Sequence, residues 1–308
     1  QISYTRAIYA ILISMIKALI KTMRPRQWPK NAFVLAAVIF DHQLSLTNPV
    51  PLLRSLVGMA LFCLLSSAVY IINDLMDIEA DRMHPVKRNR PIASGKLPVS
   101  VAVAAVIVLL LITFPGAYIL STGFFWIALA YFLVNLAYSL RLKHVPLVDV
   151  LILALGFVLR VGAGVMIVRV ERFSPWLYVV TTLLALYLGF GKRRAELALM
   201  EDDAQAHRKV LEGYNIPLLD QLITVVSSST IVAYSLYTFF APNLPADHTM
   251  MLTIPFVLYG IFRYLYLIQV KHEGGAPEEL LLTDRPLQTT IFLYGLATLL
   301  VVYIAPRF

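Results

Sequence analysis

The stretch SSAVYIINDLMDIEADRMHPVKRNRPIASG, from Ser66 to Gly95, joins an apolar segment to a densely charged one. The apolar segment begins near residue 52, and acidic residues followed by basic residues come directly after it. About 20 consecutive apolar residues are enough to cross a bilayer as a helix. The stretch therefore predicts a membrane-spanning helix with a polar site at its end.

The rest of the chain has the composition of an integral membrane protein. Of its 308 residues, 59% are hydrophobic and only 14% are charged. We predict an all-α fold, with residues 1–308 as a single membrane domain. Residues 1–23 read as an amphipathic helix on the membrane surface, because Arg6, Lys17 and Lys21 interrupt the apolar residues. Residues 24–308 are expected to form nine spans, at 31–49, 52–73, 98–120, 124–141, 146–168, 175–195, 217–241, 249–269 and 286–305.

The distribution of charge predicts the orientation of these spans. The formal net charge is +8, and most Lys and Arg residues fall in the loops on one side. Loops rich in Lys and Arg face the cytoplasm, so we expect a cytoplasmic N-terminus and a cytoplasmic site. The same charge makes a nucleic-acid partner the less favoured interpretation, because no nucleic-acid-binding motif is present. The single cysteine, Cys63, excludes an intramolecular disulfide.

The chain also has a weak internal repeat. The second span leads into NDLMDIEAD and the sixth leads into GKRRAEL, so each ends in charged residues before a long loop. Four spans separate the two, which indicates two pseudo-repeated four-helix units plus one further helix.

The acidic residues of the opening stretch share a spacing that suits a metal site. Asp74, Asp77 and Asp81 stand at i, i+3 and i+7, on one face of a helix, with Asn73 beside them. Carboxylates held together repel one another, and Mg²⁺ removes that conflict. Lys87, Arg88 and Arg90 follow, and such residues suit phosphate oxygens. A metal-bound diphosphate would satisfy both groups, whereas the alternatives are a solvated helix end and basic residues that only set topology.

These residues carry a resemblance to a known family. NDLMDIEAD followed by KRNRPIASG resembles the first aspartate-rich motif of the UbiA-type membrane prenyltransferase superfamily. The resemblance implies a UbiA-type bundle around a central cavity, with Mg²⁺ and a diphosphate at its cytoplasmic end. Asn73, Asp74, Asp77 and Asp81 would then be the metal ligands.

The chain departs from that superfamily at the second motif. In place of a D-x-x-x-D pattern it has GKRRAEL, with Lys192, Arg193 and Glu196 close together on one helix. Asp149 lies three helical turns before Arg160 in the fifth span, so both can face one cavity. Each could instead form a structural ion pair. The further candidates for substrate binding are Arg24, Lys30, Arg160, Arg263, Tyr264, Asp284 and Arg285.

Together with RPRQWPKN, PFVLYGIFRY and PEELLLTDRPLQ, this pattern resembles the polyprenyl-phosphate phosphoribosyltransferase branch of the superfamily. The branch implies transfer of 5-phosphoribose from 5-phosphoribosyl 1-diphosphate to a polyprenyl (decaprenyl) phosphate, for the synthesis of cell-wall arabinose donors. The implied location is the bacterial inner (cytoplasmic) membrane. Asp149 and Glu196 would stabilise positive charge at the anomeric carbon, and the basic residues would hold the phosphates.

Two alternative functions stay open at this point. An ordinary UbiA-type prenyltransferase would move a prenyl group from its diphosphate to an acceptor such as 4-hydroxybenzoate. A lipid-phosphate carrier would use the basic residues but would have no need of an acidic, metal-binding face. The sequence also leaves open whether the protein is a homo-oligomer.

Overall fold

The structure is a computed structural model that describes residues 2–41, 43–45, 47–168, 170, 174–202, 209–242, 244–245, 247–273, 275 and 277–304. Within these ranges the chain forms helices and connections, without a strand. The α-helices are α1 Ile2–Met23, α2 Ala36–Phe40, α3 Val50–Met76, α4 Ile78–Met83, α5 Val99–Leu120, α6 Thr122–Leu140, α7 Val148–Val168, α8 Pro175–Asp202, α9 Ile216–Phe240, α10 Ile254–Gln269, α11 Pro277–Thr283 and α12 Arg285–Tyr303. The 3₁₀ helices are η1 Pro25–Leu35, η2 Lys87–Asn89, η3 Leu142–His144, η4 Lys209–Gly213 and η5 Thr249–Thr253.

Seven helices in the described part of the chain are long and apolar enough to cross a membrane. They are α3, α5, α6, α7, α9, the continuous η5–α10 unit and α12. Helix α8 has 28 residues, which is also sufficient length, but it carries Lys192, Arg193 and Arg194. The all-helical membrane fold is confirmed, whereas the number of nine spans and the orientation stay predictions.

The first predicted span, residues 31–49, is not one helix. Its beginning belongs to η1, α2 has only five residues, and residues 43–45, 48 and 49 are not helical. Asp41 follows the end of α2, where its carboxylate accepts a hydrogen bond from Gln43 at 2.6 Å. Polar side chains that bond locally in this way compete with continuation of a helix, which explains the early end.

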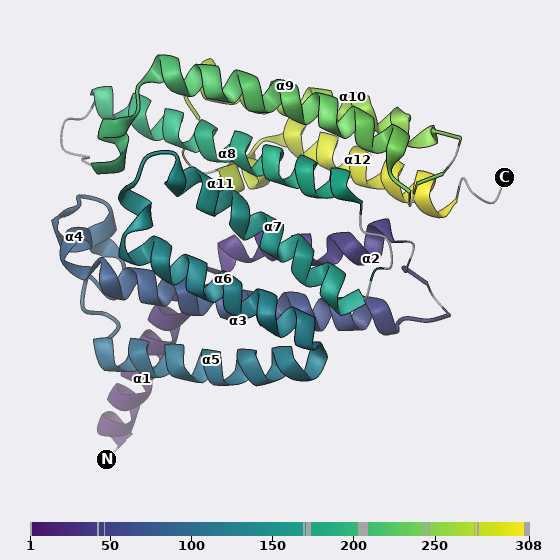
Figure 1. Cartoon of the computed structure of the whole chain (residues 1–308). Coiled ribbons are helices and arrows are strands. Elements are labelled where there is room, and N and C mark those ends of the chain that lie inside the picture. Colours follow the sequence, from purple (N-terminus) through teal and green to yellow (C-terminus); the bar gives the residue numbers. More distant parts are fainter. Residues whose placement is uncertain are drawn as a thin grey trace.

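The long helices form two groups that lie side by side (Figure 1). Helices α3, α5, α6 and α7 make one group, and α8, α9, α10 and α12 make the other. One buried cluster spans the junction, since it includes Val150 of α7, Tyr187 of α8, Ile223 of α9 and Ile268 of α10. The grouping is the one that the predicted repeat requires, and the repeat itself remains a prediction.

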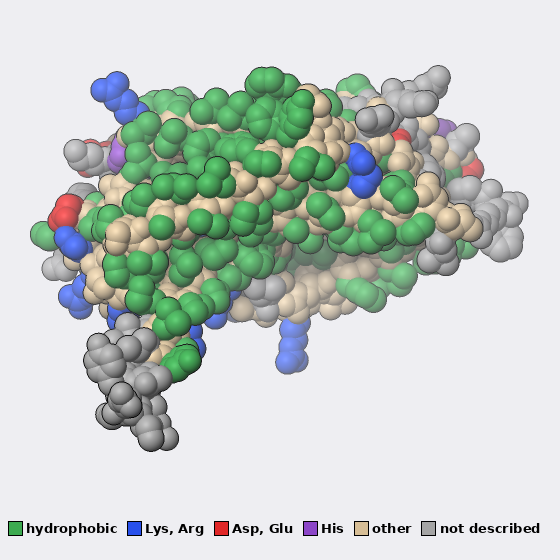
Figure 2. All heavy atoms as spheres, turned by 90° about the horizontal axis from the view of Figure 1, so that it is seen from below, with side chains coloured by type: hydrophobic (Ala, Val, Ile, Leu, Met, Phe, Trp, Pro, Cys, Tyr) green, Lys and Arg blue, Asp and Glu red, His purple; other side chains and the backbone are tan. Residues whose placement is uncertain are grey.

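The outer surface of the bundle is apolar. Leu111, Ile119 and Phe292 are each more than 65% exposed. Figure 2 shows hydrophobic side chains over most of one broad face, with several Lys and Arg side chains toward its left-hand end. A contiguous apolar surface of this extent is unfavourable in water and is typical of a lipid-facing surface.

Helix α1 extends away from the bundle beyond α5 (Figure 1). Leu12, Ile13, Ile16 and Ile20 on this helix are about half exposed, whereas Ala18 and Thr22 are buried. The described residues therefore leave an apolar face of α1 uncovered. A helix on the membrane surface would place such a face among lipids, and that placement stays a prediction.

Candidate functional site

The predicted acidic residues lie where α3 passes into α4. Helix α3 ends at Met76, and Asp77 separates it from α4. The amide of Asp77 donates to Asn73 O at 3.0 Å, and the amide of Asp81 donates to Asp77 O at 2.7 Å. Because these bonds keep the i to i−4 pattern, the interruption leaves the predicted acidic face largely intact. The side chains of Asp74 and Asp81 are both buried.

Two arginines from distant segments neutralise this face. Arg90 Nη1 lies 3.1 Å from Asp74 Oδ1 and 2.7 Å from Asp81 Oδ2. Arg24 Nη2 approaches Asp74 Oδ1 to 2.5 Å, and its guanidinium lies 5.0 Å from the centre of the Tyr70 ring. The two buried carboxylates of Asp74 and Asp81 therefore both lie within hydrogen-bond distance of the same nitrogen of Arg90.

Lys143 is a member of the site that the sequence analysis did not select. Its Nζ lies 2.5 Å from Asp77 Oδ1, and its side chain is only 11% exposed. Asn73 Nδ2 donates to the other carboxylate oxygen of Asp77 at 3.3 Å. Lys143 sits in η3, the short turn between α6 and α7. In the sequence, Lys143 counts only among the basic residues that predict the orientation of the spans. A lysine in so short a turn must nevertheless lie near the end of the bundle.

The donor atoms fit a divalent metal in part. Mg²⁺ prefers oxygen ligands and is usually held by one or two carboxylates together with substrate phosphates. Asp74 and Asp81 offer such a pair, because one cationic nitrogen already lies between them. The predicted set of three carboxylates does not close into a cage, since Asp77 faces Lys143. Across the described residues, no group of three or more His, Cys, Asp or Glu side chains could hold a metal.

A neutral histidine supports the loop that presents Arg90. His84 Nδ1 accepts hydrogen bonds from the amides of Val86 at 3.2 Å and Lys87 at 3.3 Å. Burial, followed by the charge of Lys87, lowers the pKa of this imidazole. The ring therefore stays neutral at pH 7 and can accept both bonds, which shapes the turn before Arg90.

A second group of predicted residues forms a buried network between α7 and α8. Arg193 Nε donates to Asp149 Oδ2 at 2.7 Å, and its Nη1 pairs with Glu196. Asp149 is 0% exposed and Arg193 is 1% exposed. The other oxygen of Asp149 accepts from the hydroxyl of Tyr214 at 2.7 Å, which in turn accepts from the amide of Leu147 at 2.6 Å. Burial and the bond to Asp149 raise the pKa of the Tyr214 hydroxyl, which keeps it protonated.

This network changes the expected roles within the second motif. Arg193, rather than Lys192, points inward, and Asp149 has both oxygens bonded. Glu196 keeps a side chain that is 23% exposed. The structure thus joins Asp149, Arg193 and Glu196 in one network, and within it only Glu196 has a substantial exposed surface.

Asp149 and Arg160, which the sequence places three helical turns apart on one helix, have separate hydrogen-bond partners. Arg160 donates to Asn31 Oδ1 at 2.8 Å, to Gly156 O at 2.8 Å and to the Tyr131 hydroxyl at 2.9 Å. These partners are separate from those of Asp149. Three helical turns place the two side chains about 16 Å apart along the axis, so each is satisfied by its own neighbours.

The remaining predicted residues divide between the site and the rest of the bundle. Arg263 and Asp284 form a two-bond ion pair, with Arg263 Nη2 2.8 Å from Asp284 Oδ2 and Nε 3.2 Å from Oδ1. Asp284 also caps α12, because its Oδ1 accepts from the Leu287 amide at 2.9 Å. Tyr264 is buried in the core beside Tyr187. Lys30, Lys87 and Lys192 are partly buried, whereas Arg88 and Arg285 are exposed.

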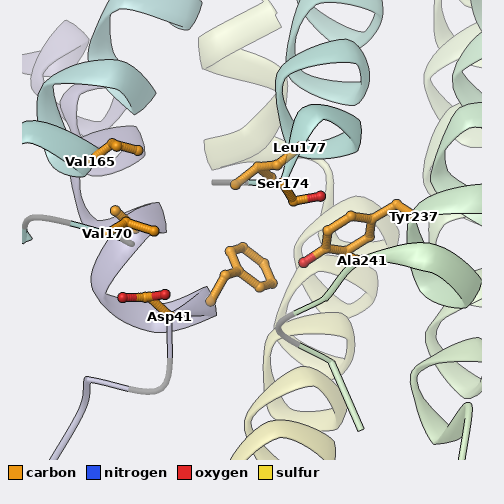
Figure 3. A pocket seen from close by; sticks show the side chains of 9 residues that line it. Asp41, Val165, Val170, Ser174, Leu177, Tyr237 and Ala241 are labelled. Carbon is orange, nitrogen blue, oxygen red and sulfur yellow. The ribbon is translucent and has the colours of Figure 1, made fainter. Parts of the chain in front are cut away.

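Two shallow hollows lie at the opposite end of the bundle from the acidic face. One is lined by Val165 near the end of α7, Ser174 and Leu177 at the start of α8, and Tyr237 near the end of α9, with Asp41 beyond α2 (Figure 3). The other is lined by Gln43, Arg54 and the last residues of α7. Neither hollow is lined by a residue predicted for the site, and the predicted central cavity stays a prediction.

Comparison with known proteins agrees with this arrangement. Residues 32–281 match the model of the UbiA prenyltransferase family. The chain is 32% identical to a decaprenyl-phosphate phosphoribosyltransferase of Corynebacterium glutamicum, over 96% of this chain and 90% of that protein. It is 34% identical to a protein of the same name from Mycobacterium tuberculosis, over 89% of this chain and 91% of that protein.

The fold is similarly shared with a solved structure. A UbiA homologue from Archaeoglobus fulgidus, bound to DMAPP and Mg²⁺, superposes with a TM-score of 0.70 at 19% identity, over 93% of this chain and 99% of that chain. The family match covers most of the sequence, and the acidic and basic residues that carried the resemblance meet at one end of the bundle. The chain therefore belongs to the UbiA prenyltransferase family, whose members are membrane-embedded transferases.

Proposed function

We propose that this protein transfers 5-phosphoribose from 5-phosphoribosyl 1-diphosphate to a polyprenyl phosphate and releases diphosphate. The observation that carries the proposal is the number of cations at the acidic face. Arg24, Arg90 and Lys143 contact the carboxylates there. Arg193 stands where a prenyltransferase would have its second acidic motif. Four phosphate groups, two in the donor diphosphate, one at the 5-position of the donor ribose and one on the acceptor, would give these cations partners during turnover.

The donor diphosphate would bind between the acidic face and the basic residues around it. Asp74 and Asp81 would hold Mg²⁺, with Asn73 and Asp77 beside it; the metal would neutralise charge on the departing diphosphate. Arg24, Arg90 and Lys143 would then turn from the carboxylates to phosphate oxygens, which they can bind equally well. Lys30, Lys87 and Lys192 lie partly buried and could extend this set.

The reaction exchanges one bond at the anomeric carbon for another. The bond from C1 to the diphosphate oxygen breaks, and its electron pair leaves with diphosphate. An oxygen of the acceptor phosphate supplies the electron pair of the new bond to C1. That phosphate is already anionic at neutral pH, so the step requires no general base. Glu196, the partly exposed acid of the second group, would favour positive charge developing on the ribose.

Asp149 is better suited to positioning than to contact with the sugar. It is fully buried, and both of its oxygens are bonded. Removing it would leave the Arg193 guanidinium without its most buried partner. We therefore assign Asp149 the role of holding Arg193 toward Glu196, in place of direct stabilisation of the anomeric carbon.

Several features of the proposal rest on the relatives. Two of them carry the name decaprenyl-phosphate phosphoribosyltransferase, which supports a decaprenyl or similar phosphate as the acceptor. The Archaeoglobus homologue binds Mg²⁺, which supports a divalent metal here. We place the acidic face at the cytoplasmic side of a bacterial membrane, where a soluble sugar diphosphate can reach it. The product would then enter the synthesis of cell-wall arabinose donors.

One alternative has a specific observation in its favour. The matched family is one of prenyltransferases, and the Archaeoglobus homologue binds the prenyl diphosphate DMAPP. Purified protein should be incubated with labelled 5-phosphoribosyl 1-diphosphate and polyprenyl phosphate, and in parallel with a prenyl diphosphate and 4-hydroxybenzoate. We expect a labelled lipid only in the first reaction, and only with Mg²⁺ present. Product in the second reaction alone would refute phosphoribosyl transfer.

The role of the acidic face can be tested in the same assay. Asp77→Asn should abolish Mg²⁺-dependent turnover while the purified protein stays folded by circular dichroism. Full activity in folded Asp77→Asn protein would remove Asp77 from the mechanism.

A further inference from the structure

Arg160 is a buried cation without an anionic partner among the described residues. It lies midway along the candidate span α7 and is 5% exposed. Its hydrogen-bond partners are an amide oxygen, a backbone carbonyl and a hydroxyl, all of them neutral. The rings of Phe62, Tyr131 and Phe157 surround the guanidinium at 5.0 to 6.0 Å. Burying a charged guanidinium within a membrane-spanning helix costs free energy. Its hydrogen bonds therefore indicate that it stabilises a segment that the fold requires.

The segment that Arg160 holds is η1, through Asn31. Asn31 is 0% exposed, and its amide nitrogen lies 3.2 Å from both Cys63 Sγ and Ser66 Oγ of α3. The side-chain oxygen of Asn31 accepts a hydrogen bond from Arg160 Nε. Asn31 therefore ties η1 to α3 and to α7 at one point, and both polar atoms of its side chain are hydrogen-bonded.

The conformation of η1 is one that local sequence does not favour. It is a 3₁₀ helix of 11 residues, whereas such helices rarely exceed four. Arg24, which precedes it, has φ 53° and ψ 62°, a left-handed conformation that is unusual for arginine. Tertiary contacts must therefore maintain the segment. The backbone of η1 also abuts α7, because a Cβ added to Gly164 would lie 2.1 Å from Val34 O.

The segment from Met23 to Asn31 meets α3 at two neighbouring residues. Ser67 Oγ donates to Met23 O at 3.1 Å and accepts from Trp28 Nε1 at 3.1 Å, while Asn31 Nδ2 lies 3.2 Å from Ser66 Oγ. Ser67 precedes Asp74 by seven residues, or about 10 Å along an α-helix. The Arg24 side chain extends over this distance to Asp74, so the position of η1 against Ser66 and Ser67 sets where its guanidinium lies.

We propose that Arg160 and Asn31 are positioning residues that fix η1 in the register at which Arg24 meets the donor diphosphate. Arg160 acts through Asn31 and η1, and it does not itself touch the phosphates. The inference rests on the proposed function only in taking Arg24 as a ligand of the diphosphate. It would hold for a prenyl diphosphate donor as well.

The test is a double-mutant cycle on diphosphate binding. Binding of inorganic diphosphate with Mg²⁺ is measured by titration calorimetry for wild type, Arg24→Gln, Arg160→Met and the double variant. We expect Arg160→Met to weaken binding about tenfold, as expected for loss of one charge-assisted contact. The double variant should bind no more weakly than Arg24→Gln alone, because both changes remove the same contact. Additive losses, or no loss in Arg160→Met, would overturn the proposal.

Two further measurements separate positioning from simple stability. Trp28 reports on η1 in a background where Trp126 and Trp176 are both replaced by Phe. Its emission should shift in Arg160→Met and should stay unchanged in Arg54→Met, a matched change at the opposite end of α3. Arg160→Lys keeps the charge but has one nitrogen in place of the three that contact separate partners, so we expect it to behave as Arg160→Met does. Wild-type diphosphate binding in Arg160→Lys would show that charge alone is sufficient, against the proposal.

A variant that still folds keeps the proposal testable. If Arg160→Met is not recovered as folded protein, Asn31→Ala removes the same link and should weaken diphosphate binding in the same direction. Steady-state kinetics with the active donor should then show a raised donor KM at nearly unchanged kcat. An unaltered donor KM in Asn31→Ala would overturn the inference. The calorimetric result with inorganic diphosphate is measured without turnover, so it is independent of which group the enzyme transfers.

Discussion

The carboxylates of Asp74, Asp77 and Asp81 each form an ion pair with Arg or Lys side chains outside α3 and α4. The partners are Arg24 and Arg90 for Asp74, Arg90 for Asp81, and Lys143 for Asp77. Carboxylates this close to a membrane would repel one another without those cations. These cations, which we expect to bind phosphate once a metal neutralises the acids, therefore stabilise the acidic face.

Replacing Arg90 tests whether this arginine and a metal ion compete for the carboxylates of Asp74 and Asp81. Arg90→Gln should strengthen the binding of Mn²⁺ alone severalfold, because Asp74 and Asp81 lose the cation that competes with the metal. The same variant should bind inorganic diphosphate more weakly, because a phosphate partner is lost. Both affinities can be measured by calorimetry. Weaker Mn²⁺ binding in Arg90→Gln would contradict the exchange, and Arg82→Gln, which changes an exposed arginine paired with Glu79, is the matched control.

Lys143 should contribute to donor affinity although it lies outside the recognised motifs. Lys143→Gln is expected to raise the donor KM about tenfold, as for loss of a charge-assisted bond, and Lys143→Arg should retain most of the affinity. Steady-state kinetics at saturating acceptor measures this effect. Lys96→Gln, a change at an exposed lysine in the connection between η2 and α5, serves as the control. An unchanged donor KM in Lys143→Gln would restrict this lysine to pairing with Asp77.

At the scale of elements, the ends of helices carry most of the polar chemistry. The end of α3, the turn at η3 and the middle of α8 supply the site, while the ion pair of Arg263 with Asp284 fastens α10 to the start of α12. The sequence analysis predicted Arg263 and Asp284 as substrate-binding residues. Their mutual two-bond geometry and the capping bond of Asp284 give them a structural function as well.

The ion pair at α12 predicts a dependence of stability on pH. The bonds from Arg263 lower the pKa of the Asp284 carboxyl, which precedes the candidate span. A lowered folded-state pKa means that the stabilisation is present above the unfolded value of about 3.9 and is lost as the pH falls below it. Asp284→Asn should therefore lower the Tm by a constant amount from pH 8 to pH 5. The difference from wild type should shrink below about pH 4.

Thermal unfolding in detergent, followed by circular dichroism, measures that difference. Asp284→Ala removes the capping acceptor as well as the charge, so its Tm should lie below that of Asp284→Asn. A Tm difference between wild type and Asp284→Asn that changes between pH 8 and pH 5 would show that another titrating group controls this helix end.

At the scale of the whole molecule, orientation follows from where the basic residues gather. The acidic face, η3 and the charged part of α8 lie at one end of the bundle, and the two hollows lie at the other. Loops rich in Lys and Arg favour the cytoplasm, so the active end should face inward. That placement would also give a water-soluble donor direct access.

Labelling of single cysteines tests the orientation. Lys96 and Asn48 are exposed near opposite ends of the bundle. In intact cells, a membrane-impermeant thiol reagent should label Asn48→Cys and should not label Lys96→Cys. In inverted vesicles the labelling should reverse. Cys63 is buried, so wild type should stay unlabelled and serve as the control. Labelling of Lys96→Cys in intact cells would reverse the proposed topology.

The sequence by itself determined the membrane class, the all-helical fold and the family, because apolar length and the NDLMDIEAD motif are local properties of the chain. It also identified the acids at 74, 77 and 81 and the cations Arg24, Arg90 and Arg193 that pair with acids. Only the tertiary structure decided the pairing itself. Lys143 reaches Asp77 from 66 residues away, and Arg160 bonds Asn31 from 129 residues away. Spacing along one helix cannot report such contacts, because they depend on how separate helices and turns pack against one another.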